Sequence, residues 1–519
     1  MKNILCRVFG LLIVANMYGQ DETLEDWYNL SLSRDSVYGV GVDAAYEFIG
    51  DRELKTVIVA VIDDGVDIAH PDLEGKIWTN ADEVVDNGVD DDGNGYIDDV
   101  HGWNFLGNPD GQNIKYETLE ITRLYRRYNK LFQGVDTVNL PKGMEDKYEQ
   151  YKEIKREFDK KYGEINDQFA EYAQLASLYK GAFAYMQEKT GKENPTFNDI
   201  LDYEATDDEE KQVKQFVLMA ENEGLTDYLE SGKDYFERSI EYNYNTEFNP
   251  RDIVNEAEAK ELGTGYGNNM VAAEDPGHGT HVSGIIAAIR NNEIGVDGIA
   301  VNAVIMPVRA IPAGDERDKD VALAIRYAAD NGAKVMNLSF GKAYSPNKEL
   351  VYDAIEYALD KDVLIVHAAG NEGLDNDKER KYPDGTLGKK KSARGWITVG
   401  ANTPYGDTAF VAPFSNVGKK GVDILAPGSE ILSLAVDGGV ASQSGTSMAA
   451  PVVAGVAAVL RGAYPDYSAP KIAKLIQKSM NANKNAVVNR SGENVKLKKI
   501  IRNPGVPDLR TALEKEGLD

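Results

Sequence analysis

The sequence predicts an α/β protein with a mainly parallel central sheet and an all-helical insertion. Several short runs of β-branched and aliphatic residues are continuous rather than alternating, which is typical of strands that are buried on both faces. Amphipathic helical patterns separate these runs, so strand and helix alternate along the chain. About 150 central residues follow a different pattern, with helical periodicity and few runs of strand type.

The first predicted strand is "VIVAVI" at 57–62, and it ends at the turn "DDGVD". The later strand-like runs lie at 304–310, 334–340, 362–370 and 396–401. Helical patterns at 319–332 and 348–361 lie between them. Functional side chains of parallel α/β folds gather at the carboxyl ends of the strands, so we look for chemistry immediately after these runs.

The central segment 113–260 is rich in Glu, Lys and Tyr, and it contains an apolar stripe with steps of three and four. The stripe consists of Tyr151, Ile154, Phe158, Tyr162, Ile165, Phe169, Tyr172, Ala176, Tyr179, Phe183 and Met186. This spacing predicts one long helix with a near-heptad seam, and shorter helices are expected at 117–132 and 207–224. The segment packs on itself or against the α/β body, and its charged faces are read as solvated faces.

The charge balance excludes some classes of partner. The chain of 519 residues has 85 acidic and 57 basic residues and a net charge of -28. General nucleic-acid binding requires basic side chains that neutralise phosphate, so we expect no nucleic-acid partner. Anionic membrane surfaces are disfavoured for the same reason.

The first 20 residues have the pattern of an export signal. Lys2 and Arg7 precede or flank the short apolar run "VFGLLIVANM", which is too short to span a bilayer. The alternative is a buried N-terminal segment. Cys6, the only cysteine, lies within this segment, so an exported mature chain would have no disulfide. We expect no transmembrane segment elsewhere and a periplasmic, cell-surface or extracellular location.

The octet "GHGTHVSG" at 277–284 contains two of the five histidines, His278 and His281. Zinc-binding pairs on helices usually have a spacing of four and an acidic neighbour, as in H-E-x-x-H. Here the spacing is three and the intervening residues are Gly and Thr, which disfavours a metal site. Glycine before His278 instead suggests a turn into a helix that presents one imidazole.

A histidine base requires an orienting carboxylate and a nucleophile. Asp63 ends the first buried strand, and Ser447 opens the apolar helix in "SGTSMAAPVVAGVAAVL". Asn371 follows another buried strand in "AAGNEG", where its amide could donate to a developing oxyanion.

The blocks "VIDDGVD", "HGTHVSG", "AAGNEG" and "GTSMAAPVVAG" resemble the signature blocks of the subtilisin-like serine proteases, the subtilases, in that family's order Asp, His, Asn, Ser. The flanking "HPDL", "NLSFG", "FSN" and "DILAPG" match as well. The resemblance covers about 36–112 and 261–519 and implies a three-layer subtilisin-like fold of the bacterial type. The expected organisation is a signal peptide at 1–20, a catalytic domain at 21–112 and 261–519, and a helical insertion at 113–260.

The resemblance implies a serine endopeptidase in which Asp63, His278 and Ser447 form the triad. Asn371 and the backbone N–H of Ser447 form the oxyanion hole, and His281 is a buried support. Two other classes stay open at this point: a catalytically silent, peptide-binding relative, and a calcium-stabilised helical scaffold.

The resemblance also implies where a polypeptide substrate binds. The extended peptide pairs with the backbone near 339–341, and its P1 side chain lies between two small apolar walls. These walls are formed by Ser339, Phe340 and Gly341 on one side and by Ala368, Ala369 and Gly370 on the other. An apolar P1 residue is therefore favoured.

The loop "DDDGNGYID" has the ligand spacing of a calcium site. Asp90, Asp92, Asn94 and Asp98 match positions 1, 3, 5 and 9 of an EF-hand loop, and Tyr96 offers its carbonyl at position 7. Position 12 is a histidine rather than the bidentate glutamate, so Asp86 or Asp99 would supply the missing carboxylate within the loop 86–99. The alternative is a solvated acidic turn.

A second calcium loop is implied by the resemblance alone. The stretch "RNNEIGVDG" at 290–298 resembles the subtilase calcium loop. Its ligands would be Asn292, the carbonyls of Ile294 and Val296, and Asp72.

Two features depart from the family pattern. Asp63 and His278 are 215 residues apart because the acidic loop and the insertion separate them. The ends of the insertion should therefore lie at the rim between two triad members, where it would cap the cleft or hold a partner. We also expect no folded pro-domain between the export signal and the matching region near Ser36.

Overall fold

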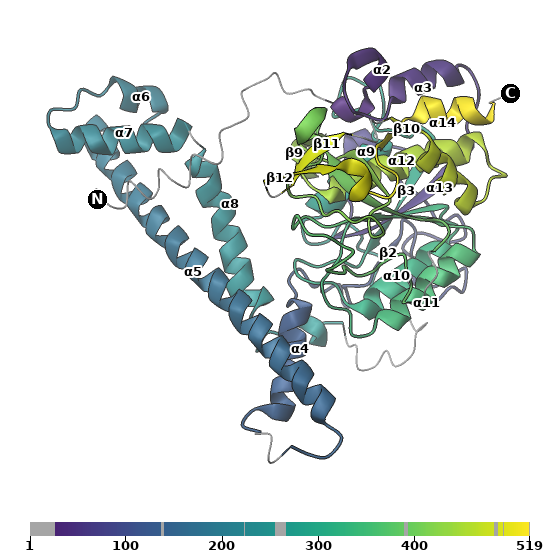
Figure 1. Cartoon of the computed structure of the whole chain (residues 1–519), viewed down its shortest axis with the longest axis horizontal. Coiled ribbons are helices and arrows are strands. Elements are labelled where there is room, and N and C mark those ends of the chain that lie inside the picture. Colours follow the sequence, from purple (N-terminus) through teal and green to yellow (C-terminus); the bar gives the residue numbers. More distant parts are fainter. Residues whose placement is uncertain are drawn as a thin grey trace. The chain divides into compact units, whose positions relative to one another are not determined.

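The computed structural model describes residues 26–135, 140–222, 224–254, 266–388, 393–481, 486–490 and 492–517. The export signal predicted at 1–20, including Cys6, lies outside the described residues. The described chain forms two compact units. The helical unit comprises Ile121–Phe248, and the α/β unit comprises the residues up to Glu120 and from Asn249 onward. Each is described separately below, with the elements labelled as in Figure 1.

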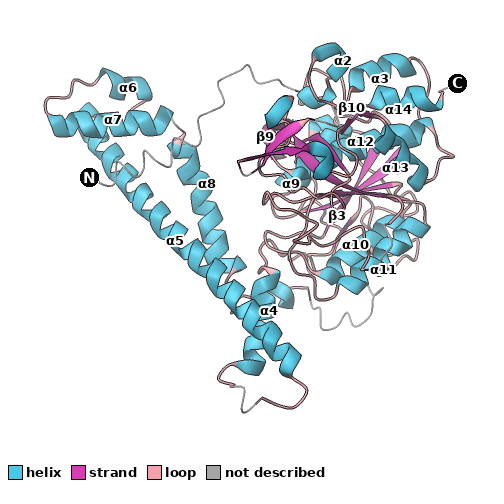
Figure 2. Cartoon of the chain, in the orientation of Figure 1, coloured by secondary structure: helices cyan, strands magenta, loops and turns pink. Residues whose placement is uncertain are grey.

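A seven-stranded sheet in the order β2-β3-β1-β4-β5-β6-β7 forms the centre of the α/β unit (Figure 2). Every strand pair in it is parallel. The strands are β1 (Val57–Asp63), β2 (Trp103–Asn104), β3 (Ala303–Arg309), β4 (Val335–Leu338), β5 (Leu364–Ala368), β6 (Trp396–Asn402) and β7 (Ile424–Pro427). The predicted α/β fold with a mainly parallel sheet is therefore confirmed.

Helices cover both faces of the sheet and give three layers. Val59 and Val61 of β1 belong to a core shared with α3, α9, α12, α13 and α14. Ala60 and Ile62 point to the opposite face and pack with α10 and α11. The bounds are α3 (Val42–Ile49), α9 (Gly277–Ala287), α10 (Asp318–Asp330), α11 (Lys348–Asp360), α12 (Thr446–Ala463), α13 (Ala469–Lys478) and α14 (Leu509–Glu516). The continuous apolar strand runs are explained by burial on both faces.

Helix α12 is the central helix of this unit. Among the described helices, it alone is long and apolar enough to cross a membrane, with 18 residues and a mean hydropathy of 1.4. However, 89% of it is buried inside the protein, and it contacts β1 and β4 to β7. Its apolar composition is therefore accounted for by core packing.

Smaller elements complete the α/β unit. They are α2 (Leu32–Asp35) and three antiparallel pairs: β8 (Ile431–Leu434) with β9 (Val440–Gln443), β10 (Met480–Asn481) with β13 (Val506–Pro507), and β11 (Val487–Arg490) with β12 (Glu493–Lys496).

The helical unit is built along one long helix, as its apolar stripe predicts. Helix α5 (Glu145–Thr190) has 46 residues, about 69 Å at 1.5 Å per residue. The other helices are α4 (Glu120–Phe132), α6 (Phe197–Asp202), α7 (Asp208–Asn222) and α8 (Leu225–Arg238). Six stripe residues are buried: Tyr151, Ile154, Phe158, Ile165, Tyr172 and Met186. Tyr162 and Phe169 remain 39% and 37% exposed, so the seam is not covered along its whole length.

The compact helical unit is shorter than the predicted insertion. Ile114 is 1% exposed and Val254 2% exposed, and both pack in the core of the α/β unit beside α10 and α11. Tyr116 forms a bridge with Ala313. The residues that flank the helices at both ends are thus part of the α/β unit.

Candidate active site

Asp63 and His278 lie together at the carboxyl edge of the sheet. Asp63 is the last residue of β1, and His278 lies in the first turn of α9. The Nδ1 of His278 is 2.6 Å from Oδ1 of Asp63, whose side chain is 3% exposed. The imidazole is 34% exposed. This geometry fixes the ring with Nδ1 toward the carboxylate and leaves Nε2 as the nitrogen for proton transfer.

The electrostatics of this pair favour a charged imidazole. Burial lowers the pKa of His278, but the charge and hydrogen bond of Asp63, together with the charge of Asp64, outweigh it and raise the pKa to about 9. Asp64 accepts hydrogen bonds from the backbone N–H groups of His278 (3.2 Å) and Gly279 (2.7 Å). Burial and the neighbouring charge of Asp63 raise the pKa of Asp64 to about 7. Asp64 therefore holds the start of α9 in place beside the imidazole.

Ser447 lies in the first turn of α12, as its glycine-rich approach suggests. Its hydroxyl donates to the carbonyl of Ser339 at 3.0 Å, and the Ser339 hydroxyl donates to the carbonyl of Ser447 at 2.8 Å. A serine hydroxyl has one proton to donate, so Ser447 must turn about its Cα–Cβ bond to donate to His278 instead. In structures without substrate, the hydrogen bonds of a catalytic site are often poorly aligned, and they tighten when substrate binds.

The strand register brings these groups to one edge of the sheet. Ile62 of β1 pairs with Leu338 of β4. The next residues, Asp63 and Ser339, are therefore neighbours on adjacent strands, which lie about 4.8 Å apart. Because one of them binds His278 and the other binds Ser447, the carboxylate, the imidazole and the hydroxyl converge on the same edge.

Asn371 is oriented by Thr446. Its Oδ1 accepts from the backbone N–H of Thr446 at 2.8 Å and from the Thr446 hydroxyl at 2.9 Å. The Thr446 hydroxyl oxygen in turn accepts from the N–H of Gly370 at 3.0 Å. With its oxygen occupied, the exposed side chain of Asn371 presents its Nδ2 donor beside the start of α12.

The two predicted substrate walls follow adjacent strands. Ser339, Phe340 and Gly341 come directly after β4, and Ala368 ends β5, which pairs with β4 from Val335 to Leu338. Gly341 is exposed, whereas Ala368 and Ala369 are 5% and 1% exposed. Gly370 has a φ of 102°, a conformation that glycine adopts readily.

Two other buried histidines, His281 and His367, make separate contacts. Nε2 of His281 lies 3.1 Å from the carbonyl of Ile431 and 3.0 Å from that of Ala441, which ties α9 to the β8–β9 hairpin. Burial lowers its pKa to about 4. His367 in β5 is 2% exposed and packs against Trp396, with ring centroids 5.2 Å apart. Burial likewise lowers its pKa to about 4.

The acidic loop forms a carboxylate cluster that differs from the predicted one. Ligand oxygens of Glu83, Asp90 and Asp92 all lie within 4.8 Å of one another. One Glu83 oxygen is buried and has no hydrogen-bond partner among the described residues. Asp98 lies outside this trio, and its carboxylate accepts from the N–H groups of Asn87 (3.0 Å) and Gly88 (2.9 Å).

The other predicted residues of the acidic loop, Asn94 and Tyr96, make contacts within the protein. Asn94 lies beside Asp92, with its Nδ2 2.9 Å from a carboxylate oxygen, and its own Oδ1 accepts from the N–H of Tyr96. The Tyr96 ring packs edge-on against Trp103 and Tyr327. Carboxylate oxygens are ligands that calcium prefers, and this loop gathers Glu83 with Asp90 and Asp92 rather than Asp86 or Asp99.

The second predicted calcium loop, at 290–298, donates hydrogen bonds to the carboxylate of Asp72. Asp72 is fully buried, and its oxygens accept from Asn292 Nδ2 at 2.6 Å and from the N–H of Val296 at 3.0 Å. The Oδ1 of Asn292 accepts from the N–H of Ile294 at 3.2 Å. The structure thus gathers Asp72, Asn292, Ile294 and Val296 in one loop.

Three functional neighbours escaped the sequence interpretation: Asp64, Glu83 and Thr446. Asp64 follows the catalytic candidate directly, and doubling of Asp at a strand end was the available signal. No local pattern marks Thr446 as the partner of Asn371, because the two residues are 75 positions apart. Glu83 lies outside the EF-hand spacing, so only the fold brings it to the loop.

Comparison with known proteins agrees with this arrangement. The subtilase family model matches residues 54–493. Thermitase of Thermoactinomyces vulgaris is 38% identical over 194 residues, which cover 37% of this chain and 64% of that protein. A thermophilic serine proteinase of Bacillus sp. strain AK1 is 42% identical over 184 residues, or 35% of this chain and 42% of the relative. The cell wall-associated protease of Bacillus subtilis strain 168 is 39% identical over 214 residues, or 41% and 22%.

The matches thus span less than two-thirds of each of these relatives. The family model, in contrast, covers most of this chain, and it includes the strand end at Asp63, the α9 start at His278 and the α12 start at Ser447. This chain belongs to the subtilase family.

Proposed function

We propose that the protein is an exported serine endopeptidase that cleaves polypeptides through Asp63, His278 and Ser447. The observation that carries the proposal is the 2.6 Å contact between Asp63 and His278 at the sheet edge where α12 presents Ser447. Selective labelling of Ser447 by a fluorophosphonate probe tests it. Export is supported by the apolar N-terminal pattern and by the name of the cell wall-associated relative.

In this mechanism the Ser447 hydroxyl leaves the Ser339 carbonyl and donates to Nε2 of His278. The imidazole accepts the proton as the oxygen attacks the scissile carbonyl, and it returns the proton to the leaving amine. Asp63 keeps Nδ1 protonated and stabilises the imidazolium. Because the pKa of His278 is raised to about 9, the fraction of neutral base grows as the pH rises toward that value.

The oxyanion would lie between Nδ2 of Asn371 and the N–H of Ser447. That N–H is among the first of α12, where helical N–H groups have no intrahelical acceptor. Both donors are fixed before the reaction starts, since Thr446 holds Asn371. Preorganised donors of this kind stabilise the developing charge in the transition state rather than the bound substrate.

We therefore expect Asn371→Ala to lower kcat about 10²- to 10³-fold with little change in KM, a range typical of enzymes that lose one oxyanion-hole donor. Thr446→Val should give a smaller loss of kcat, because it removes the hydroxyl that orients Asn371. Thr446→Ser, which keeps the hydroxyl, is the matched control. Steady-state kinetics on a chromogenic peptide measure both constants. An unchanged kcat in Asn371→Ala would contradict the oxyanion role.

We infer that the acidic loop binds a structural calcium ion through Glu83, Asp90 and Asp92, with Asn94 and the Tyr96 carbonyl as further candidates. The unpartnered buried oxygen of Glu83 supports this fit. Calcium would supply the positive charge that balances these carboxylates. The loop around Asp72 and Asn292 is the second candidate; there Asp72 already accepts hydrogen bonds from within the protein.

If calcium binds only the folded state, it adds about 2.7 kcal/mol to the free energy of unfolding when its concentration is about a hundred times Kd. A chelator should therefore lower the melting temperature, and Asp92→Ala should shrink that shift. Asp82→Asn is the control, because it removes a charge from the same loop outside the carboxylate trio. The melting temperature with calcium and with chelator is the measurement. Identical melting curves for the wild type in both conditions would remove the site.

A catalytically silent, peptide-binding relative is the second candidate, and it would bind the same extended peptides through the walls after β4 and β5. The intact set of Asp63, His278, Ser447 and Asn371 favours the enzyme. Probe labelling distinguishes the two, because a silent relative would bind peptide without forming a covalent adduct.

A further inference from the structure

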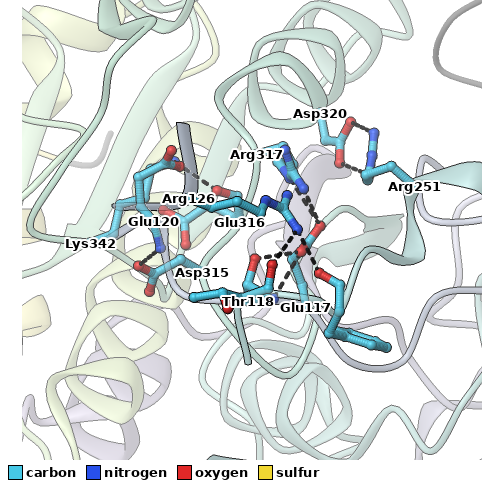
Figure 3. A network of polar contacts seen from close by, with 12 residues as sticks. Glu117, Thr118, Glu120, Arg126, Arg251, Asp315, Glu316, Arg317, Asp320 and Lys342 are labelled. Atoms are coloured by element: carbon cyan, nitrogen blue, oxygen red, sulfur yellow. Dashed lines mark hydrogen bonds and ion pairs between the residues drawn. The ribbon is translucent and has the colours of Figure 1, made fainter. Parts of the chain in front are cut away.

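Lys342 is a buried cation that directly follows the substrate wall Ser339–Gly341 in the sequence. Figure 3 shows it beside Glu120. Its side chain is 2% exposed. The ammonium group contacts Glu120 Oε2 at 3.0 Å, Asp318 Oδ1 at 2.8 Å and the carbonyl of Glu316 at 2.7 Å. Three acceptors thus surround the ammonium group, which has three N–H donors.

The partners of Lys342 are themselves held firmly. The N–H of Glu120 donates to Asp315 at 2.7 Å, and the Glu120 side chain is 5% exposed. Asp318 accepts from the Ser345 hydroxyl and from the N–H of Asn347, both at 2.8 Å. Asp318 is also the first residue of α10. A carboxylate is favourable at that end of a helix, where the N–H groups lack acceptors.

The substrate wall is therefore fixed at both of its ends. At one end the hydroxyls and carbonyls of Ser339 and Ser447 bond to each other. At the other end the backbone of Lys342 pairs with Tyr382 in both directions, at 3.0 and 2.8 Å, while its side chain is bound to carboxylates. Gly341, the residue before Lys342, is exposed between these anchors.

Glu120 connects this anchor to the helical unit along the chain. It is the first residue of α4, and the compact helical unit begins at the next residue, Ile121. The ion pair between Lys342 and Glu120 thus joins the end of the substrate wall to the residue directly before the helical unit.

We propose that Lys342 is a positioning residue for peptide binding, which holds the substrate wall Ser339–Gly341 in register through its ion pair with Glu120. The proposal rests on the proposed protease function, because it assigns the wall to peptide substrates. Lys342 does not touch the reacting atoms. Its effect should appear in the binding of an extended peptide, which pairs along the wall, more than in the acylation of Ser447 by a small reagent.

The ion pair suits this role because both partners are buried. A buried charge that loses its partner is strongly unfavourable, so the pair tolerates little change in the distance between Glu120 and the end of the wall. A wall held in this way is preorganised for an extended peptide, and preorganisation reduces the ordering cost of binding.

The test compares Lys342→Met and Glu120→Gln with the wild type. For a four-residue chromogenic peptide, we expect KM to rise about tenfold in Lys342→Met and about threefold in Glu120→Gln, with kcat within about twofold. The rate of fluorophosphonate labelling should fall by less than about threefold. In the double variant, KM should rise about as much as in Lys342→Met alone, because the two residues form one pair.

Asp320→Asn is the matched control. Asp320 forms an equally buried ion pair on the same helix, with Arg251 at 2.8 and 2.9 Å, but it does not contact the wall. It should lower the melting temperature and leave the peptide KM unchanged. A KM that rises as much in Asp320→Asn, or a peptide KM unaffected in Lys342→Met and Glu120→Gln, would overturn the positioning role. Absence of labelling in the wild type would instead refute the protease function itself.

Discussion

Ser447→Ala should abolish covalent labelling by a fluorophosphonate and should lower peptide hydrolysis about 10⁶-fold. The alanine has no oxygen to attack the scissile carbonyl, and water must then react without a positioned nucleophile. The substitution removes one hydrogen bond, from the hydroxyl to the Ser339 carbonyl, so the fold should be retained. Circular dichroism and the melting temperature verify that the variant is folded before the loss of activity is interpreted.

His278→Ala should cause a loss of similar size, because the nucleophile and its base act as one unit. The double variant Ser447→Ala/His278→Ala should therefore hydrolyse peptide no more slowly than either single variant. His281→Ala makes an informative comparison: that ring contacts the backbone of the β8–β9 hairpin, so its removal should lower stability more than kcat. Full activity in Ser447→Ala would end the proposal that this chain is a serine protease.

The parallel sheet could be predicted from the sequence because burial on both faces demands continuous apolar runs. The run at 57–62 corresponds to β1 with one further residue, Asp63. Asp63 lies where an apolar run ends in a turn, whereas His278 and Ser447 lie where a glycine-rich stretch leads into an apolar helix. The near-heptad stripe similarly specified the long α5 helix.

Other features depend on partners that are distant in sequence, and local patterns do not encode them. Glu120 and Lys342 are separated by 222 residues, and no local pattern marks either side chain as buried, yet both are buried. Glu83 joins Asp90 and Asp92 only after the loop has folded. The compact helical unit is shorter than the predicted insertion for the same reason, because the burial of Glu117, Glu120 and Arg251 depends on partners that are distant in sequence.

The buried ion pairs at the ends of the helical unit predict how much of the insertion can be removed. Replacement of 121–248 with a short Gly/Ser linker should give a soluble protein that the probe still labels. A short linker suffices because both flanks are bound to the same region: Tyr116 bridges to Ala313, and Arg251 pairs with Asp320. The seven-stranded sheet and the helices on both of its faces lie entirely outside the replaced segment.

Replacement of 113–260 should instead give insoluble or probe-silent protein, although it removes only twenty more residues. That deletion takes away Ile114 and Val254 from the core, and it leaves Asp320 without Arg251 and Arg317 without Glu117. It also removes Glu120 from Lys342. Breaking a buried pair such as Arg251–Asp320 costs about 3–5 kcal/mol, a large part of the roughly 5–15 kcal/mol that stabilise a typical domain. Solubility, melting temperature and probe labelling of the two variants provide the comparison.

The soluble variant also tests whether the helical unit restricts access to the cleft. If it does, the 121–248 replacement should cleave a small chromogenic peptide as well as the full chain does, and a folded protein substrate faster. An unchanged ratio between the two substrates would instead identify the unit as a docking surface.

If both replacements were insoluble, the helical unit would be required for folding. If both were active, the buried pairs at its ends would contribute little. The difference between the two deletions therefore measures what the flanking residues contribute, separately from residues 121–248.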